Sequence, residues 1–206
     1  MIELVFAIVV IGILAALAIP RMERDLRQEA ADNILSAIRY TQHLALMDDK
    51  HKFNDAKWQR AFWQMQFEGC AGGGLFYTIG SDENYGGDID ESEAILDPAN
   101  SKRVFWRNTD SCTHGGDSDT SPNIFLTKKY GIASVSGSGG CNGVQYLGFD
   151  HLGRPHVGFS SSGKPDNASY MGSACTFTFT LEEGDDIILN IEPETGYAYI
   201  IGQKNI

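Results

Sequence analysis

The 206-residue sequence predicts an α+β protein in which one long N-terminal α-helix packs on an antiparallel β-sheet head. Three observations support this fold class. From residue 4 to residue 19 there is no polar side chain, and an amphipathic helical pattern follows directly. Beyond residue 60 the apolar residues alternate or form short runs between glycine-rich segments, and no second helical pattern of similar strength occurs.

Residues 1–20 form the first of three predicted segments. A helix over residues 4–19 spans about 24 Å, against a hydrocarbon thickness of about 30 Å. Glu3 stands out because a carboxylate inside an apolar helix costs a few kcal/mol, on the order of 2–3, without a partner. Glu3 either lies at an interface, where the helix dipole favours an anion, or pairs with a cation from another subunit. Its position alone does not decide between these readings.

Residues 21–50 are predicted to continue the same helix as its amphipathic half, ending between residues 47 and 50. Charged residues supply one face. Small and apolar residues recur at three- and four-residue steps on the other face, which we expect to pack on the sheet: Leu26, Ala30, Ile34, Ala37, Ile38, Thr41 and Ala45.

Residues 51–206 are predicted to form the β-rich head, which opens with a polar loop at 51–57. Trp63, Met65 and Phe67 alternate with polar residues, a pattern typical of a half-buried strand. The segment 192–196, reading EPETG, predicts a hairpin turn. Trp58, Trp63 and Trp106 are interpreted as core or sheet-packing residues. Further strands are expected at 75–79, 104–107, 124–128, 144–149, 156–159, 175–181, 186–191 and 197–201.

The net charge of the chain bears on which classes of partner it can bind. Sixteen basic against 27 acidic residues give a formal net charge of −11. A surface of this sign repels phosphate backbones and anionic headgroups, so nucleic acid is not expected as a general partner.

The four cysteines predict two disulfides in an oxidising compartment. Cys70, Cys112, Cys141 and Cys175 form no CxxC pair, and their flanks are polar and glycine-rich. Four cysteines permit three connectivities. We favour Cys70–Cys112 with Cys141–Cys175, because neighbours in sequence tend to be neighbours in a meandering sheet.

Motifs for catalysis are missing from the sequence, so we predict that the protein is not an enzyme. It contains no HExxH, no GxSxG and no phosphate-binding loop, and the glycines at 137–140 read as a turn. His151 and His156 flank a Gly-Arg-Pro turn and are expected at the surface. No cofactor is predicted, and a solvated loop is the favoured interpretation of the acidic stretch 80–97. Calcium is kept as a minor alternative there, with Asp82, Asp88, Asp90 and Asp97 as candidate ligands.

The N-terminal run IELVFAIVVIGILAALAIPR resembles the methylation segment of type IV pilins and type II secretion pseudopilins. Those families carry a Glu near the mature N-terminus, a Gly within the apolar helix and a Pro at its end, and Glu3, Gly12 and Pro20 match in order and spacing. The strong likeness covers roughly the first 45 residues. The segment FDHLGRP and the final hairpin are similar, more loosely, to the C-terminal half of H-type pseudopilins and minor pilins.

The resemblance implies a structural function: a subunit of a pilus or pseudopilus-like filament, built from copies of this chain or with other pilins. Glu3 is then expected to neutralise the N-terminal amine of a neighbouring subunit. Gly12 and Pro20 are expected to weaken the helix in the assembled filament. The chain is expected in the inner membrane of a Gram-negative-type bacterium, after processing by a prepilin peptidase and with assembly machinery. It then enters a periplasmic or extracellular filament, whose process the sequence leaves open among adhesion, twitching motility, DNA uptake and protein secretion.

Two other interpretations stay open. The chain could be a membrane-anchored surface binding or adhesion protein that does not polymerise, in which case replacing Glu3 leaves surface display unchanged. It could also be a secreted enzyme with a cleaved leader, in which case the mature protein begins after residue 20.

Overall fold

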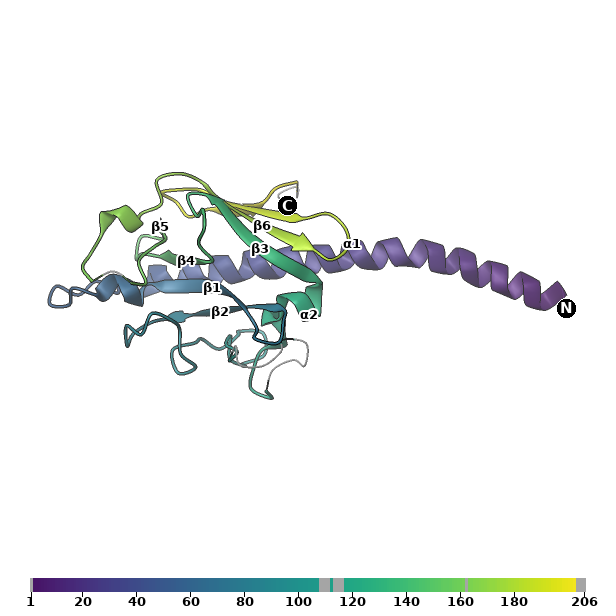
Figure 1. Cartoon of the computed structure of the whole chain (residues 1–206), viewed down its shortest axis with the longest axis horizontal. Helices are drawn as coiled ribbons and strands as arrows, with labels where there is room; N and C mark the ends of the chain where they lie inside the picture. Colours follow the sequence, from purple (N-terminus) through teal and green to yellow (C-terminus); the bar gives the residue numbers. More distant parts are fainter. Residues whose placement is uncertain (1, 108–111, 113–116, 162, 203–206) are drawn as a thin grey trace.

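The computed structural model describes residues 2–107, 112, 117–161 and 163–202, with the side chains of Ile2 and of residues 14–25 outside that description. Helix α1 spans Ile2–Met47 without a break and ends where the amphipathic pattern predicts. Its N-terminal half extends away from the head as a free rod (Figure 1). Its C-terminal half lies against the head.

In its described residues the head contains two four-stranded sheets, and every neighbouring pair of strands in them is antiparallel. The first sheet has the order β2-β1-β4-β5, and the second has the order β3-β6-β7-β8. The observed fold class is thus the predicted α+β class. The bounds are β1 Trp63–Gly69, β2 Leu75–Ser81, β3 Ile132–Gly139, β4 Tyr146–Phe149, β5 Pro155–His156, β6 Cys175–Leu181, β7 Ile187–Ile191 and β8 Ala198–Ile200.

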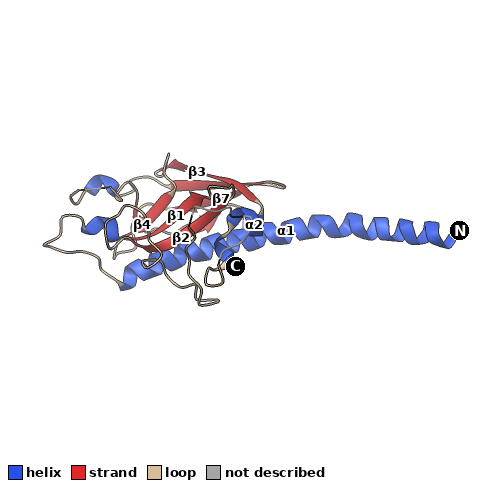
Figure 2. Cartoon of the chain, turned by 60° about the horizontal axis from the view of Figure 1, so that its bottom comes forward, coloured by secondary structure: helices blue, strands red, loops and turns tan. Residues whose placement is uncertain are grey.

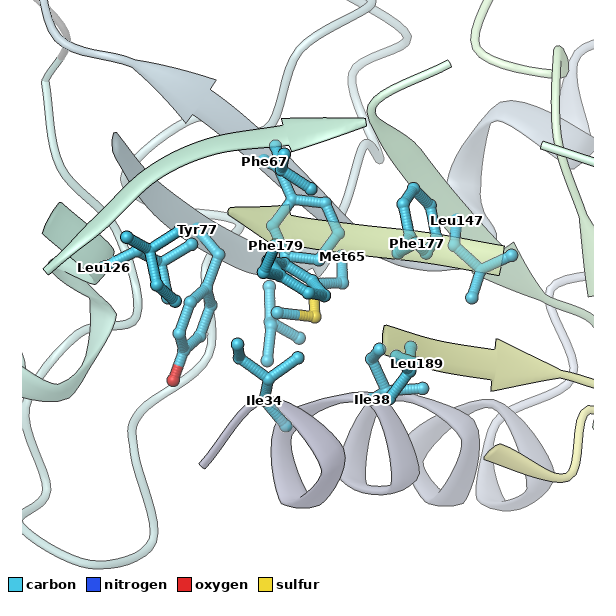
Figure 3. Close-up of a cluster of buried hydrophobic side chains, with 14 of the residues drawn as sticks. Ile34, Ile38, Met65, Phe67, Tyr77, Leu126, Leu147, Phe177, Phe179 and Leu189 are labelled. Atoms are coloured by element: carbon cyan, nitrogen blue, oxygen red, sulfur yellow. The ribbon is translucent and has the colours of Figure 1, made fainter. Parts of the chain in front are cut away.

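Helix α1 runs along one side of both sheets and shares a single core with them (Figure 2). Ile34 and Ile38 are buried in its second half and point into a cluster that β1, β4, β6 and β7 also supply (Figure 3). In this cluster the ring of Phe67 on β1 meets the rings of Phe177 and Phe179 on β6 at centroid distances of 5.3 Å. Six of the seven residues of the predicted stripe are buried: Ala30, Ile34, Ala37, Ile38, Thr41 and Ala45. The prediction was wrong for Leu26, which is 41% exposed because it precedes the packed part of the helix, and Ala31 is buried although it was not predicted.

Several predicted strands are present, including 144–149 as β4 (Tyr146–Phe149), but two were wrong and the predicted strand 156–159 is extended only at His156, in the two-residue β5. β1, β2, β6, β7 and β8 lie at the predicted places, and the turn 192–196 joins β7 to β8. The segment 104–107 is not a strand, because Val104 bonds once each to Ile79 and Ile95 before the chain leaves the sheet.

The segment 124–128 is helical rather than extended. A short 3-10 helix, η3 (Pro122–Ile124), is capped by the Ser121 hydroxyl, and α2 (Leu126–Tyr130) follows it and ends at Gly131 in the left-handed region (φ 67°). A serine cap followed by proline and a terminal glycine are ordinary helix start and stop signals. These signals make the segment helical, although the apolar run between them had predicted a strand.

Both disulfides are formed, and their pairing is the one favoured from the sequence. Cys70–Cys112 joins the end of β1 to the segment before η3, with Cα atoms 5.6 Å apart. Cys141–Cys175 joins the turn after β3 to the start of β6, with Cα atoms 5.1 Å apart. The described residues include no free cysteine. Disulfides are typical of proteins that fold in an oxidising compartment.

The double variant Cys141→Ser/Cys175→Ser is expected to lose about 2–4 kcal/mol of unfolding free energy, because a loop of 34 residues is no longer closed in the unfolded chain. Urea denaturation of the variant and of the wild-type chain, both kept oxidised, measures this loss. A midpoint equal to that of the oxidised wild type would contradict it.

Candidate functional site

The most unusual surface of the molecule is the first half of α1. Residues 3–13, called here the exposed arm, are all exposed to solvent. Their large apolar side chains are between 39% and 72% exposed: Leu4, Val5, Phe6, Ile8, Val9, Val10, Ile11 and Ile13. They lie on every side of the helix, and the rod stands clear of the head (Figure 1).

An apolar surface of this kind is unusual on a soluble monomer. Soluble monomers rarely expose a contiguous apolar patch larger than a few hundred Å². With eight such side chains roughly half exposed, the arm carries on the order of 10 kcal/mol of burial free energy that the single chain does not realise. Because a helix that is apolar all round is stable only when covered all round, the arm fits insertion among several neighbours or into an apolar phase.

The three residues singled out in this helix lie along one continuous rod. Glu3 is in the first turn and exposed. Apart from the backbone of its own helix and its chain neighbours, no described atom lies within 4 Å of the position that a Cβ at Gly12 would take. The side chain of Pro20 lies outside the described set, and the backbone is helical there. In the single chain α1 is thus uninterrupted. The weakening expected between Gly12 and Pro20 concerns the assembled filament and stays a prediction.

Within the part of the chain that was described, no helix combines the length and the apolarity of a membrane span.

Side-chain bonds to the head fix the direction of the arm. The Arg27 guanidinium donates to the carbonyl oxygens of Asp185 and Asp186, each at 2.9 Å. Further along α1, the Gln42 amide donates at 2.8 Å to the carbonyls of Gly153 and Thr195. These contacts lie at both ends of the packed half of α1. They therefore fix the orientation of the helix relative to the head, and with it the direction in which the exposed arm extends.

The FDHLGRP segment builds a turn around a nearly buried carboxylate. Asp150 accepts hydrogen bonds from the backbone N–H groups of Leu152 and Arg154, both at 2.9 Å, and from the Arg154 guanidinium at 2.7 Å. His156 Nε2 lies 3.4 Å away. Burial raises the pKa of Asp150, but the hydrogen bonds from His156 and Arg154 outweigh it and hold this pKa well below its ordinary value. The motif thus has a structural role, since it fixes the corner between β4 and β5.

Asp150→Asn is expected to lower the unfolding free energy by about 2–3 kcal/mol at pH 7, because charge-assisted bonds are lost around a buried group. The carboxyl binds protons less readily when folded than when unfolded. Its contribution is therefore complete above the unfolded pKa of about 4 and falls as the pH drops below that value. Urea titrations between pH 7 and pH 3 test this. Asp150→Asn should show a weaker pH dependence than wild type, and parallel curves would contradict the assignment.

His156 is buried, so its predicted surface position was wrong. Its ring fits beside Phe62, its Nδ1 lies 2.9 Å from Ser169 Oγ, and its Nε2 faces Asp150. This Ser-His-Asp set does not resemble a working nucleophile. Ser169 is itself buried and its hydroxyl donates to the carbonyl of Asp166, so a substrate carbonyl has no access to it. His151, by contrast, is exposed as predicted and faces Asp49 at 3.4 Å. His114 lies outside the described residues.

The four calcium candidates do not converge. Among the described residues, no three acidic, histidine or cysteine side chains gather as metal ligands would. The carboxylate of Asp82 is buried and accepts hydrogen bonds from the N–H groups of Gly86 and Gly87.

The carboxylate of Asp97 organises the loop around it, because it accepts hydrogen bonds from four residues: Ala99, Asn100, Ser121 and Asn123. Asp90 accepts from Asn84, and Asp88 is exposed. Calcium binding stays a prediction.

Two surface features were missed from the sequence. One is a groove beside α1, and the other is the exposed Phe53 at the far end of the molecule from the N-terminus. The groove is lined by residues from α1, β2, α2 and the loops between them, so no local pattern announces it. For Phe53, the mixture of a phenylalanine with lysines in a polar loop was the available signal.

Comparison of the chain with family models, with curated proteins and with solved structures gives no match.

Proposed function

We propose that the chain is a structural subunit of a type IV pilus-like or type II secretion pseudopilus-like filament, assembled through the exposed arm of α1. The observation that carries this proposal is an all-round apolar rod, rigidly directed by a folded, disulfide-bonded head. The head then coats the filament, and its net negative charge keeps the assembled surface soluble.

The proposed route to the filament begins at the inner membrane. The apolar arm holds the processed chain in the bilayer until assembly machinery transfers it to the growing filament. The two disulfides fit a periplasmic or extracellular head. No catalytic role is proposed, because the buried His156 and Ser169 are built into the structural turn.

Glu3 supplies the register in this proposal. A carboxylate at one end of an apolar rod must find a cation when the rod is buried, and the N-terminal amine of a neighbour is the proposed partner. A slip of one helical turn, about 5.4 Å, leaves both charges unpaired in a medium of low dielectric constant, so one axial offset is favoured.

Glu3→Ala tests this function against a membrane-anchored protein that does not polymerise. We expect the variant to reach the membrane in wild-type amount and to yield at least tenfold less sheared filament in electron micrographs. His43→Ala is the matched control, since His43 is an exposed polar residue of the same helix outside the arm. Unchanged surface display and unchanged filament yield in Glu3→Ala would favour the non-polymerising alternative.

A further inference from the structure

A groove of about 540 Å³ lies along the packed half of α1, on the side that faces β2 and α2. This lateral groove is bounded by α1 residues from Glu29 to Tyr40 and by the loop after Ile95. Tyr77 and Tyr130 are buried beside it, and Tyr77 reaches from β2 towards α1, where its hydroxyl donates to the Asn33 side chain (Figure 3). The two tyrosine rings thus form part of the floor of the groove with little of their surface exposed, and the Lys129 ammonium lies 5.0 Å from the centroid of the Tyr130 ring.

The rim of the lateral groove carries uncompensated negative charge. Lys129 is already engaged, since it pairs with Glu29 at 3.0 Å and donates to Asn123 at 2.7 Å. Asp32 accepts only from the neutral Gln28 amide, and Asp97 accepts only from neutral donors. Among the described residues, neither carboxylate has a cation within ion-pair distance. An aromatic floor below two such carboxylates favours a ligand that is both cationic and aromatic.

The loop that follows α1 carries exposed basic side chains and an exposed aromatic ring, in contrast to the acidic rim of the groove. This tip loop, residues 51–57, lies at the end of the molecule remote from the N-terminus (Figure 1). The Phe53 side chain is 95% exposed, and its ring contacts that of His51 edge-on at a centroid distance of 4.7 Å. Lys52 and Lys57 are exposed, and within the described structure their ammonium groups form no ion pair. The tip loop therefore presents one aromatic ring between two exposed lysines. Its own carboxylate, Asp55, accepts hydrogen bonds from the Lys57 backbone N–H and the Tyr85 hydroxyl.

We propose that the tip loop of one copy docks in the lateral groove of a second copy. Phe53 packs on the tyrosine floor, while Lys52 and Lys57 approach Asp32 and Asp97. The proposal rests on the filament function above and names a contact between heads, which the exposed arm does not make.

The contact requires a second copy, because the tip loop of a chain cannot reach the lateral groove of the same chain. From the middle of the groove at Ser36 to the end of α1 at Met47 the helix rises about 17 Å, and α1 is unbroken over that stretch. The contact joins two different patches, so it is heterologous. Repeated with an axial offset, such contacts generate an open helical array rather than a closed dimer.

Photo-cross-linking on the full chain in producing cells tests the contact. Phe53→p-benzoylphenylalanine, activated by light, is expected to give a product of twice the chain mass. Its cross-link should map to the tryptic peptide 28–39 or to the segment 95–104 of the other copy. Tyr197→p-benzoylphenylalanine is the matched control, because Tyr197 is an exposed aromatic residue on the hairpin between β7 and β8. It should not label the groove.

Charge reversal makes the test specific. Adding Lys52→Glu and Lys57→Glu to the photoreactive chain should lower the dimer yield at least tenfold. Asp32→Lys in the same chain should restore it, because Asp32 is exposed and can be replaced without loss of packing. Asp97 is left intact since it organises its own loop.

The outcomes separate the contact from the function beneath it. Filaments whose cross-links map elsewhere on the neighbouring copy, or to a different protein, overturn the docking and leave the filament function standing. A chain that stays monomeric and gives no intermolecular product overturns both. Reversal without rescue by Asp32→Lys overturns the assigned charge pairing.

Discussion

Filament yield is expected to fall at least 100-fold in the double variant Ile8→Lys/Ile11→Lys. Both side chains are more than 60% exposed in the single chain and belong to the exposed arm. A lysine near the centre of an apolar environment costs about 2.5–3.5 kcal/mol, so two of them outweigh much of what burial of the arm contributes. Electron microscopy of sheared material, quantified against total chain, measures the loss.

The head should be unaffected by these two lysines, which gives the experiment its control. Neither side chain packs on the head, so the melting temperature should shift by about 1 °C or less. His43→Lys introduces a charge on an exposed polar site of the same helix and should retain filaments. Filaments of normal yield from Ile8→Lys/Ile11→Lys would show that the arm is not buried in the assembly.

Phe179→Ala is expected to have the largest effect on stability, with a loss of about 3–5 kcal/mol. Phe179 is fully buried on β6, and its ring meets that of Phe67 on β1 at 5.3 Å, so it joins the two sheets to each other. In a domain of this size such a loss lowers the melting temperature by roughly 10 °C.

Urea denaturation of the full chain in detergent measures this effect. Thr178→Ala is the matched control, because Thr178 is the neighbouring residue on the other, half-buried face of β6 and should change stability by about 0.5 kcal/mol or less. A similar cost for both variants would contradict the described core.

The long-range architecture was predictable where one residue pattern decides it. The stripe from Ala30 to Ala45 predicted both the packed face of α1 and its end. The alternation of Cys175, Phe177 and Phe179 with threonines predicted β6, and the two disulfides followed from the order of the cysteines.

Prediction failed where tertiary contacts override local composition. β3 contains mainly small and polar residues around Ile132 and Val135, so its composition did not predict a strand. The turn predicted at 137–140 was wrong for the same reason, because residues 137–139 belong to β3. It is extended because it pairs along its length with β6. The helical α2 region shows the opposite error, in which an apolar run concealed a cap, a proline and a terminal glycine.

In the candidate site, too, the features within one continuous segment were predictable and those assembled from distant segments were not. The exposed arm is a continuous segment, so its apolar character and the position of Glu3 could be read directly. The lateral groove could not, because Asp32, Tyr77 and Tyr130 come from three distant segments that only the fold brings together. His156 was misplaced because a turn sequence normally faces solvent, whereas this turn folds inward around Asp150.

A density map of the native assembly, obtained by electron cryomicroscopy from sheared surface material, is the most direct test of the central claim. We expect residues 3–13 of each copy at the filament axis, surrounded by the same segment of its neighbours, with the heads outside. Surface material in which this chain occurs only as separate copies, with the arm in lipid or removed, would contradict the account.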